Sequence, residues 1–194
     1  MRRFSLDALA PTPWRNGGGL TREIAAGNVD GHDGTGWDWR LSVASIRADG
    51  PFSVFDGVDR VATLVDGHLE LTSARRTLRW SRPGDTHAFA GDDAFDCKVA
   101  PEGARLLNVM AARARLLPCV AVHEDDATLD GSQTVAGCWL VLEGCFEIVS
   151  QQGRLVLEAG EGCVVDGAPP AAQARRRSAQ SRLAEVRFLH RDHP

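Results

Sequence analysis

Two arginines in strand-like segments are the side chains best suited to binding an anion. Strand alternation places Arg40 and Ser42 on one face and their aliphatic neighbours on the other. Arg60 shares its face with Ala62 and Leu64, which predicts that this face is turned inward. A guanidinium inside a protein needs an anionic partner. The pattern leaves open whether that partner is a carboxylate of the protein or of a ligand.

Two further segments offer polar groups to the same kind of site. In residues 106–110, Asn108 and Met110 point the same way. Residues 14–24 contain three consecutive glycines, but neither a P-loop lysine nor a surrounding βαβ unit accompanies them. By residue type alone, a tight connector before a strand is favoured over a ligand-lining loop.

The histidines raise the alternative of a metal-dependent enzyme. His68 and Glu70 lie on the same face of one strand, and His87 follows a later turn. A metal centre needs three or four converging ligands, and the chain has no His-x-His pair. Ordinary polar positions on strands are therefore favoured, and no metal or other cofactor is expected.

Composition and charge exclude several classes of partner. A formal net charge of −4 does not favour binding to nucleic acid or to an anionic membrane. The longest uncharged stretch, around residues 132–142, is too short to span a bilayer, and Asp7 interrupts any signal-peptide core. Five cysteines without a Cys-x-x-Cys pair are typical of free thiols in a reducing compartment. We therefore expect a cytoplasmic protein, for which a homodimer remains open.

The elements that must position these residues are short strands. Residues 183–188 are typical, because Ala184, Val186 and Phe188 face one way and charged residues face the other. Glycine and proline turn signals separate such runs. Residues 168–181, with two prolines and three consecutive arginines, are expected to form an exposed loop. The pattern predicts an all-β sandwich or barrel.

An internal repeat indicates two units of one architecture. Residues 64–71 match residues 141–148, and this match aligns Gly67 with Gly144. A glycine followed by an acidic residue comes after each of these glycines at nearly equal spacing. Two matched turns are less easily explained by chance than one.

A turn in the first copy resembles a characteristic turn of cupin barrels. It reads Pro83-Gly84-Asp85-Thr86-His87, whereas residues 159–163 of the second copy lack the histidine. A charged stretch followed by a proline, at residues 113–118, marks the break between the copies. We therefore expect a bicupin of two cupin-like, RmlC-like jelly-roll barrels, with an N-terminal barrel over residues 1–115 and a C-terminal barrel over residues 116–194.

A series of motifs spans residues 14–110. In order, they are Trp14-Arg15-Asn16-Gly17-Gly18-Gly19, Thr21, Glu23-Ile24, Trp39-Arg40-Leu41-Ser42, Gly50-Pro51-Phe52-Ser53, Asp59-Arg60, Phe89-Ala90-Gly91-Asp92 and Asn108-Val109-Met110. In kind and order they resemble the HutD/Ves family of small bacterial proteins linked to histidine utilisation. The first blocks are the most specific, and beyond residue 110 the similarity rests mainly on the repeat.

The resemblance implies a bicupin without the usual cupin metal and a regulatory role that limits histidine catabolism. The implied signal is a small anionic pathway intermediate, such as urocanate or an N-acylated glutamate. The residues that would line one pocket are Asn16, Arg40, Ser42, Arg60 and Asn108, with His87 as an addition. An arginine pair in a partly dry barrel suits a carboxylate or dicarboxylate through bidentate hydrogen bonds.

Three functions follow from these observations. The favoured one is a non-enzymatic protein that binds a small carboxylate and thereby modulates histidine utilisation. The second is a metal-dependent cupin enzyme that acts on a small organic acid through His68, Glu70 and His87. The third is a structural or interaction protein whose barrel is filled by its own side chains.

Overall fold

A computed structural model of the chain describes residues 1–14, 17–30 and 36–191. Their regular secondary structure consists of strands and one short 3-10 helix, η1 (Leu6–Ala8), joined by turns and loops. The strands are β1 (Arg2–Ser5), β2 (Pro11–Pro13), β3 (Gly19–Gly27), β4 (Trp39–Ile46), β5 (Gly50–Phe52), β6 (Val58–Thr72), β7 (Thr77–Trp80), β8 (Thr86–Ala90), β9 (Phe95–Ala112), β10 (Leu116–His123), β11 (Ala127–Leu129), β12 (Thr134–Glu143), β13 (Cys145–Ser150), β14 (Gly153–Glu158), β15 (Glu161–Asp166), β16 (Ala172–Arg176) and β17 (Arg182–His190). The predicted all-β class is confirmed.

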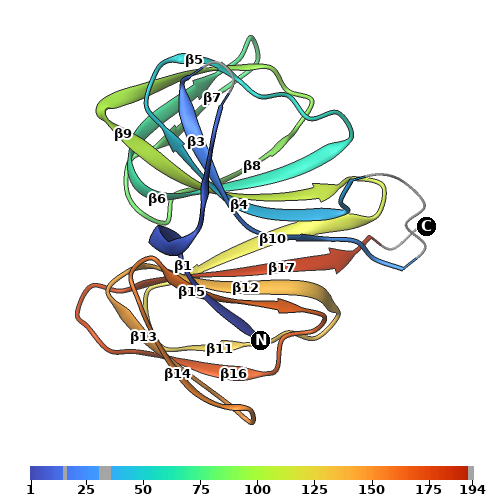
Figure 1. Ribbon diagram of the computed structural model, residues 1–194, viewed down its shortest axis with the longest axis vertical. Coiled ribbons are helices and arrows are strands. Elements are labelled where there is room, and N and C mark those ends of the chain that lie inside the picture. Colours follow the sequence, from blue (N-terminus) through green and yellow to red (C-terminus); the bar gives the residue numbers. More distant parts are fainter. Residues whose placement is uncertain (15–16, 31–35, 192–194) are drawn as a thin grey trace.

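The strands gather in two stacked bodies, one above the other in Figure 1. In the first half, the order of neighbours is β2-β3-β4-β9-β6-β7, with β5 also paired to β9 and β8 to β6. The second half has a five-stranded sheet, β1-β15-β12-β17-β10, and a four-stranded sheet, β11-β16-β13-β14.

The sequence repeat corresponds to a repeat of strand pairing. The long strand β6 pairs first with β8 and then, beyond Gly67, with β7. In the second half β12 pairs with β15, and beyond Gly144 β13 pairs with β14. Both glycines have positive φ, of 81° and 71°. A Cβ on Gly67 would lie 2.1 Å from the backbone oxygen of Gly103, so this turn requires glycine.

Three apolar clusters fill the interior. One lies within the first half and one within the second. The third joins the halves, because it contains residues of both, such as Val109 and Val186. Within it the ring centroids of Trp39 and Phe188 are 5.3 Å apart. Alternate residues of β4, β6 and β9 therefore face either this shared core or the interior of the first half.

The structure differs from the sequence expectations at two places. Residues 168–181 are not simply an exposed loop, because β16 lies within them and buries Ala172 and Ala174 while its arginines stay exposed. The run of arginines hides the alternation of β16 in the sequence. At the N-terminus, β1 pairs with β15, so residues 2–5 belong to the sheet of the second half. The proposed boundary at residue 115 otherwise remains a prediction.

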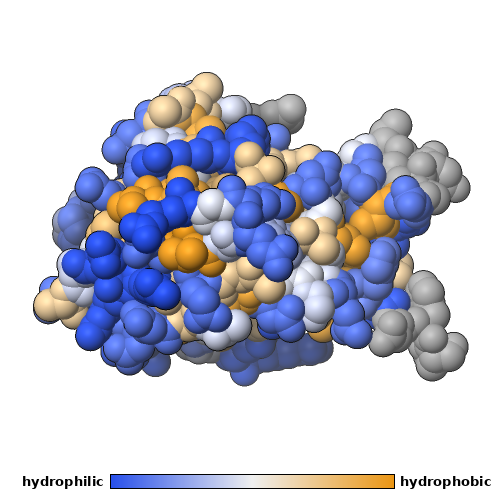
Figure 2. Space-filling model, turned by 90° about the horizontal axis from the view of Figure 1, so that it is seen from below, coloured by the Kyte–Doolittle hydropathy of each residue, from blue (hydrophilic) through white to orange (hydrophobic). Residues whose placement is uncertain are grey.

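The surface is mostly polar. Figure 2 shows the end formed by the second half, where hydrophilic residues dominate and apolar patches are small and separate. Among the described residues, the large apolar side chains that are exposed are Met1, Val54, Leu117 and Val156. The described part of the chain contains no helix long and apolar enough to cross a membrane.

Candidate functional site

Strand register brings the predicted site residues together on three neighbouring strands. Strand β9 lies between β4 and β6, and its Met110 pairs with Arg40 on one side and with Arg60 on the other. In the next inward-facing row, Asn108 pairs with Ser42 and with Ala62. These two rows face the interior of the first half, and all of their residues except Ala62 form a floor of polar groups around Met110.

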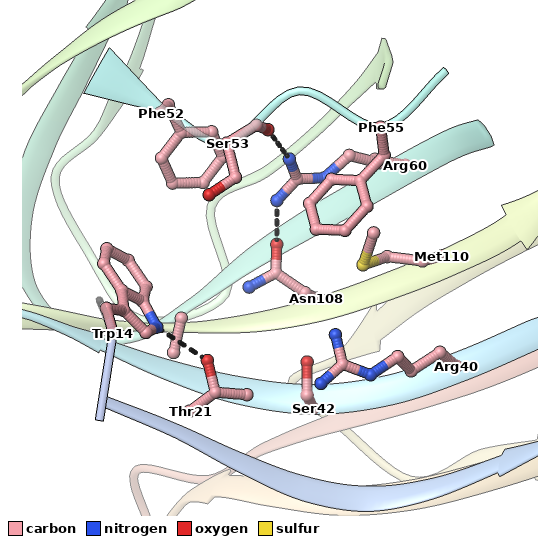
Figure 3. A pocket seen from close by; sticks show the side chains of 11 residues that line it. Trp14, Thr21, Arg40, Ser42, Phe52, Ser53, Phe55, Arg60, Asn108 and Met110 are labelled. Carbon is pink, nitrogen blue, oxygen red and sulfur yellow. Dashed lines mark hydrogen bonds between the residues drawn. The ribbon is translucent and has the colours of Figure 1, made fainter. Parts of the chain in front are cut away.

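This floor lies at the base of a pocket of about 200 Å³ (Figure 3). The residues that line the pocket are Trp14, Thr21, Arg40, Ser42, Ala44, Phe52, Ser53, Phe55, Arg60, Asn108 and Met110. Four of the predicted site residues are among them: Arg40, Ser42, Arg60 and Asn108. The fifth, Asn16, lies outside the described residues.

Arg60 is the charged group buried most deeply in the pocket. Its side chain is only 4% exposed, and its guanidinium donates to the backbone oxygen of Ser53 at 3.0 Å and to Oδ1 of Asn108 at 2.8 Å. Its Nε is buried and has no hydrogen-bond partner among the described residues. No described carboxylate pairs with Arg60, so the anionic partner expected of an interior guanidinium is not supplied by the described chain.

Aromatic rings take the place of that partner. The guanidinium carbon of Arg60 lies 4.6 Å from the ring centre of Phe52, 5.2 Å from that of Phe55 and 5.1 Å from that of Phe89. Ring faces attract a cation, but more weakly than a carboxylate does. Burial lowers the pKa of Arg60 to about 10, and the positive charge of Arg40 acts in the same direction. The folded protein therefore holds this charge at a cost.

Arg40 differs from Arg60 because it has a partner of its own. Its Nε donates to the Glu23 carboxylate at 2.8 Å, and the side chains of Arg40 and Glu23 are 22% and 54% exposed. Glu23 reaches Arg40 from the neighbouring strand β3 and is not part of the pocket lining. Figure 3 shows the end of the Arg40 guanidinium beside Ser42.

The structure does not bring His87 into the pocket. Its Nε2 is 2.8 Å from the backbone oxygen of Arg79, and its ring packs edge-on against Trp80. The addition of His87 to the predicted site therefore finds no support in the pocket lining.

The residues of the metal hypothesis are likewise engaged separately. His68 bonds to Glu102 at 3.0 Å, and Glu70 accepts a hydrogen bond from Arg79. Among the described residues, no group of three or more histidines, cysteines or acidic residues is placed to hold a metal ion.

Sequence reasoning missed the aromatic wall. Phe52, Ser53 and Phe55 come from β5 and the following turn, and Trp14 follows β2. The segments that carry them, at residues 14–19 and 50–55, contain recognisable motifs, but the pattern does not assign these side chains to the site. No local pattern indicates that these two segments meet, because only the path of the chain across the sheet brings both segments over the floor of the pocket.

The corresponding space in the second half is filled. The repeat aligns Arg60 with Gly137 and Ala62 with Trp139, which is almost fully buried. A Cβ on Gly137 would lie 2.6 Å from Cγ of Pro169, so Pro169 covers the position that Arg60 has in the first half. A large ring and a proline thus lie where the first half has Ala62 and the Arg60 cation of its pocket.

The fold and pocket define a cupin-like β-protein with a cationic interior pocket in its first half. Solved structures support the fold: a cupin 2 conserved barrel domain protein from Leptotrichia buccalis matches with a TM-score of 0.62 and 10% identity, covering 98% of this chain and 96% of that one. HutD from Pseudomonas fluorescens SBW25 matches with a TM-score of 0.82 and 22% identity over 98% of this chain and 99% of that one.

Sequence comparison identifies the family. The HutD family model matches residues 7–184. Protein Ves of Citrobacter koseri is 34% identical over 173 residues, which cover 86% of this chain and 84% of that protein. An uncharacterised 21.2 kDa protein in the hutC 3' region of Pseudomonas putida is 39% identical over 109 residues, which cover 54% of this chain and 56% of that protein. The chain belongs to the HutD family, which is linked to histidine utilisation.

Proposed function

We propose that this chain is a non-enzymatic binding protein for a small carboxylate, and that it modulates histidine utilisation by sensing a pathway intermediate of the urocanate or N-formylglutamate class. The observation that carries the proposal is Arg60, a buried guanidinium that lines a pocket and has no carboxylate partner among the described residues. A ligand carboxylate would supply the missing negative charge in a site of reduced dielectric.

Binding rather than catalysis fits the chemistry of the lining. Its polar side chains are guanidinium, amide and hydroxyl groups and one indole N–H, and no acidic residue, histidine or cysteine lines it within the described residues. Such groups recognise an anion through hydrogen bonds and charge. General acid–base catalysis near neutral pH uses other side chains.

Three further features belong to the same proposal. Each half is a cupin-like barrel of the jelly-roll type, which the repeated strand pairing supports. The protein acts in the cytoplasm, in keeping with its five free cysteines. Its partner is a small anionic metabolite rather than a nucleic acid or a membrane, in keeping with the net charge of −4.

Calorimetric titration with urocanate, its neutral carboxamide and N-formylglutamate tests the proposal. We expect at least one acid to bind and the carboxamide to bind much more weakly, because only the acid neutralises the buried cation. Arg40→Ala should weaken binding, whereas Arg79→Ala, which removes a 69% exposed arginine outside the pocket, should not. Equal binding of urocanate and its carboxamide would refute carboxylate recognition.

A further inference from the structure

The charged groups at the pocket leave room for one ligand negative charge, not two. Arg40 and Arg60 are the cations of the described lining, and Glu23 forms an ion pair with Arg40 through the contact to Nε. Asn108 and Ser53 bind Arg60 through neutral oxygens. Among the described residues, the two arginines and Glu23 together leave one positive charge uncompensated.

The space between the two guanidinium groups is not polar. Met110 pairs with both arginines across the sheet, and Figure 3 shows its thioether between their side chains. The walls are formed largely by Trp14, Phe52 and Phe55. A second carboxylate would lie against these apolar groups or near Glu23, and a charge desolvated without a partner is costly.

One carboxylate finds enough donors. Oδ1 of Asn108 accepts from Arg60, so this contact fixes the amide with its Nδ2 pointing away from Arg60, and the only other described contact of Nδ2 is a long one of 3.4 Å. Ser42 is its cross-strand neighbour on the floor. The Asn108 amide offers N–H donors next to Arg60, and the Ser42 hydroxyl offers an O–H donor on the far side of Asn108, beside Arg40.

We infer that the pocket selects a monocarboxylate with a short, flat, apolar body over a dicarboxylate of the same shape, and that Glu23 sets this preference from outside the lining. The inference rests on the proposed function, because it specifies which carboxylates the same pocket accepts. Glu23 acts through charge: it halves the positive charge that a ligand meets, while its hydrogen bond keeps Arg40 in place.

Crotonate and fumarate are matched probes, since both are planar four-carbon acids and fumarate carries a carboxylate in place of the methyl group. We expect crotonate to bind the wild-type protein about tenfold or more tightly than fumarate, measured by ligand-observed NMR titration at low ionic strength. Glu23→Gln keeps an acceptor for Arg40 but removes the charge. It should improve crotonate binding about threefold and fumarate binding about tenfold, because fumarate carries two charges.

Glu102→Gln is the control variant, because Glu102 is 56% exposed, close to the 54% of Glu23, and pairs with His68 away from the pocket. It should change neither affinity. Fumarate binding as tightly as crotonate to the wild type would overturn the inference while leaving carboxylate recognition intact. A crotonate-to-fumarate ratio unchanged by Glu23→Gln would remove Glu23 from the selection. Binding of neither acid, nor of urocanate or N-formylglutamate, would overturn the proposed function as well.

Discussion

Replacing Arg60 by methionine separates the contribution of this buried cation to folding stability from its contribution to ligand binding. Burial lowers the pKa of Arg60 from its ordinary value to about 10, which means that the buried charge costs about 3 kcal/mol of folding free energy. Because the pKa is lower in the folded protein, this cost is fully present below about pH 10 and disappears only above the higher pKa of the unfolded chain. At neutral pH the full cost of the buried charge is therefore included in the measured free energy of unfolding.

Methionine removes that cost but leaves other groups without partners. Oδ1 of Asn108 and the backbone oxygen of Ser53 lose their donors, at about 1–3 kcal/mol for each group that stays dry. The linear methionine side chain keeps contact with the phenylalanine rings. The opposing terms are of similar size, so we expect the free energy of unfolding of Arg60→Met to stay within about 2 kcal/mol of the wild type, with a cooperative transition.

Ligand binding should respond very differently. Loss of the Arg60 cation, which has no carboxylate partner among the described residues, should weaken binding of a small carboxylate by about 2–4 kcal/mol, or roughly 30- to 1,000-fold. Urea unfolding and calorimetric titration on wild type, Arg60→Met and Arg79→Met give both quantities, and the exposed Arg79 is the control. If Arg60→Met lost more than about 4 kcal/mol of unfolding free energy and kept its affinity, the reasoning would be refuted and Arg60 would serve stability rather than binding.

Three further predictions follow from other parts of the chain. Gly67→Ala should lower the free energy of unfolding by about 3 kcal/mol or more, since its Cβ would meet a backbone oxygen at 2.1 Å. Gly160 is the control: it has nearly the same φ but open space around it, so Gly160→Ala should cost about 1 kcal/mol. Equal losses for the two variants in urea unfolding would contradict this prediction. Burial raises the pKa of Cys97 to about 11, so the folded state favours the neutral thiol, and unfolding free energy should fall as the pH rises from about 9 towards 11. At pH 8 a thiol reagent should therefore label the half-buried Cys119 well before Cys97, and the reverse order would count against the burial of Cys97. Untagged protein should contain no stoichiometric transition metal, and elemental analysis that finds about one zinc, iron or manganese per chain would revive the metal-dependent enzyme.

Sequence alone determined which side chains share a face. The period of a strand is two and depends only on local backbone geometry, so alternation correctly pairs Arg40 with Ser42, and Asn108 with Met110. Apolar neighbours in alternation likewise predict the burial of Arg60. The repeat predicts the matching turns at Gly67 and Gly144, because a turn that needs positive φ selects glycine.

Local patterns misjudge places where burial depends on a distant partner. Glu185 is expected on a polar face, but it is 6% exposed and lies 2.8 Å from His123 on the neighbouring strand. His87 matches a turn of the cupin type, yet its ring packs against Trp80. In each case the sequence identifies the side chain correctly but not its environment.

Only the tertiary structure decided what the pocket is. Register placed Met110 between Arg40 and Arg60, and strand order brought Glu23 to Arg40. The turn after β5 carried Phe55 over the Arg60 guanidinium. Strand alternation assigns a side chain to a face but carries no information about which strand lies next to it or in what register. Those choices are made by long-range pairing and packing over the whole chain, and here they leave the buried cation Arg60 facing a pocket.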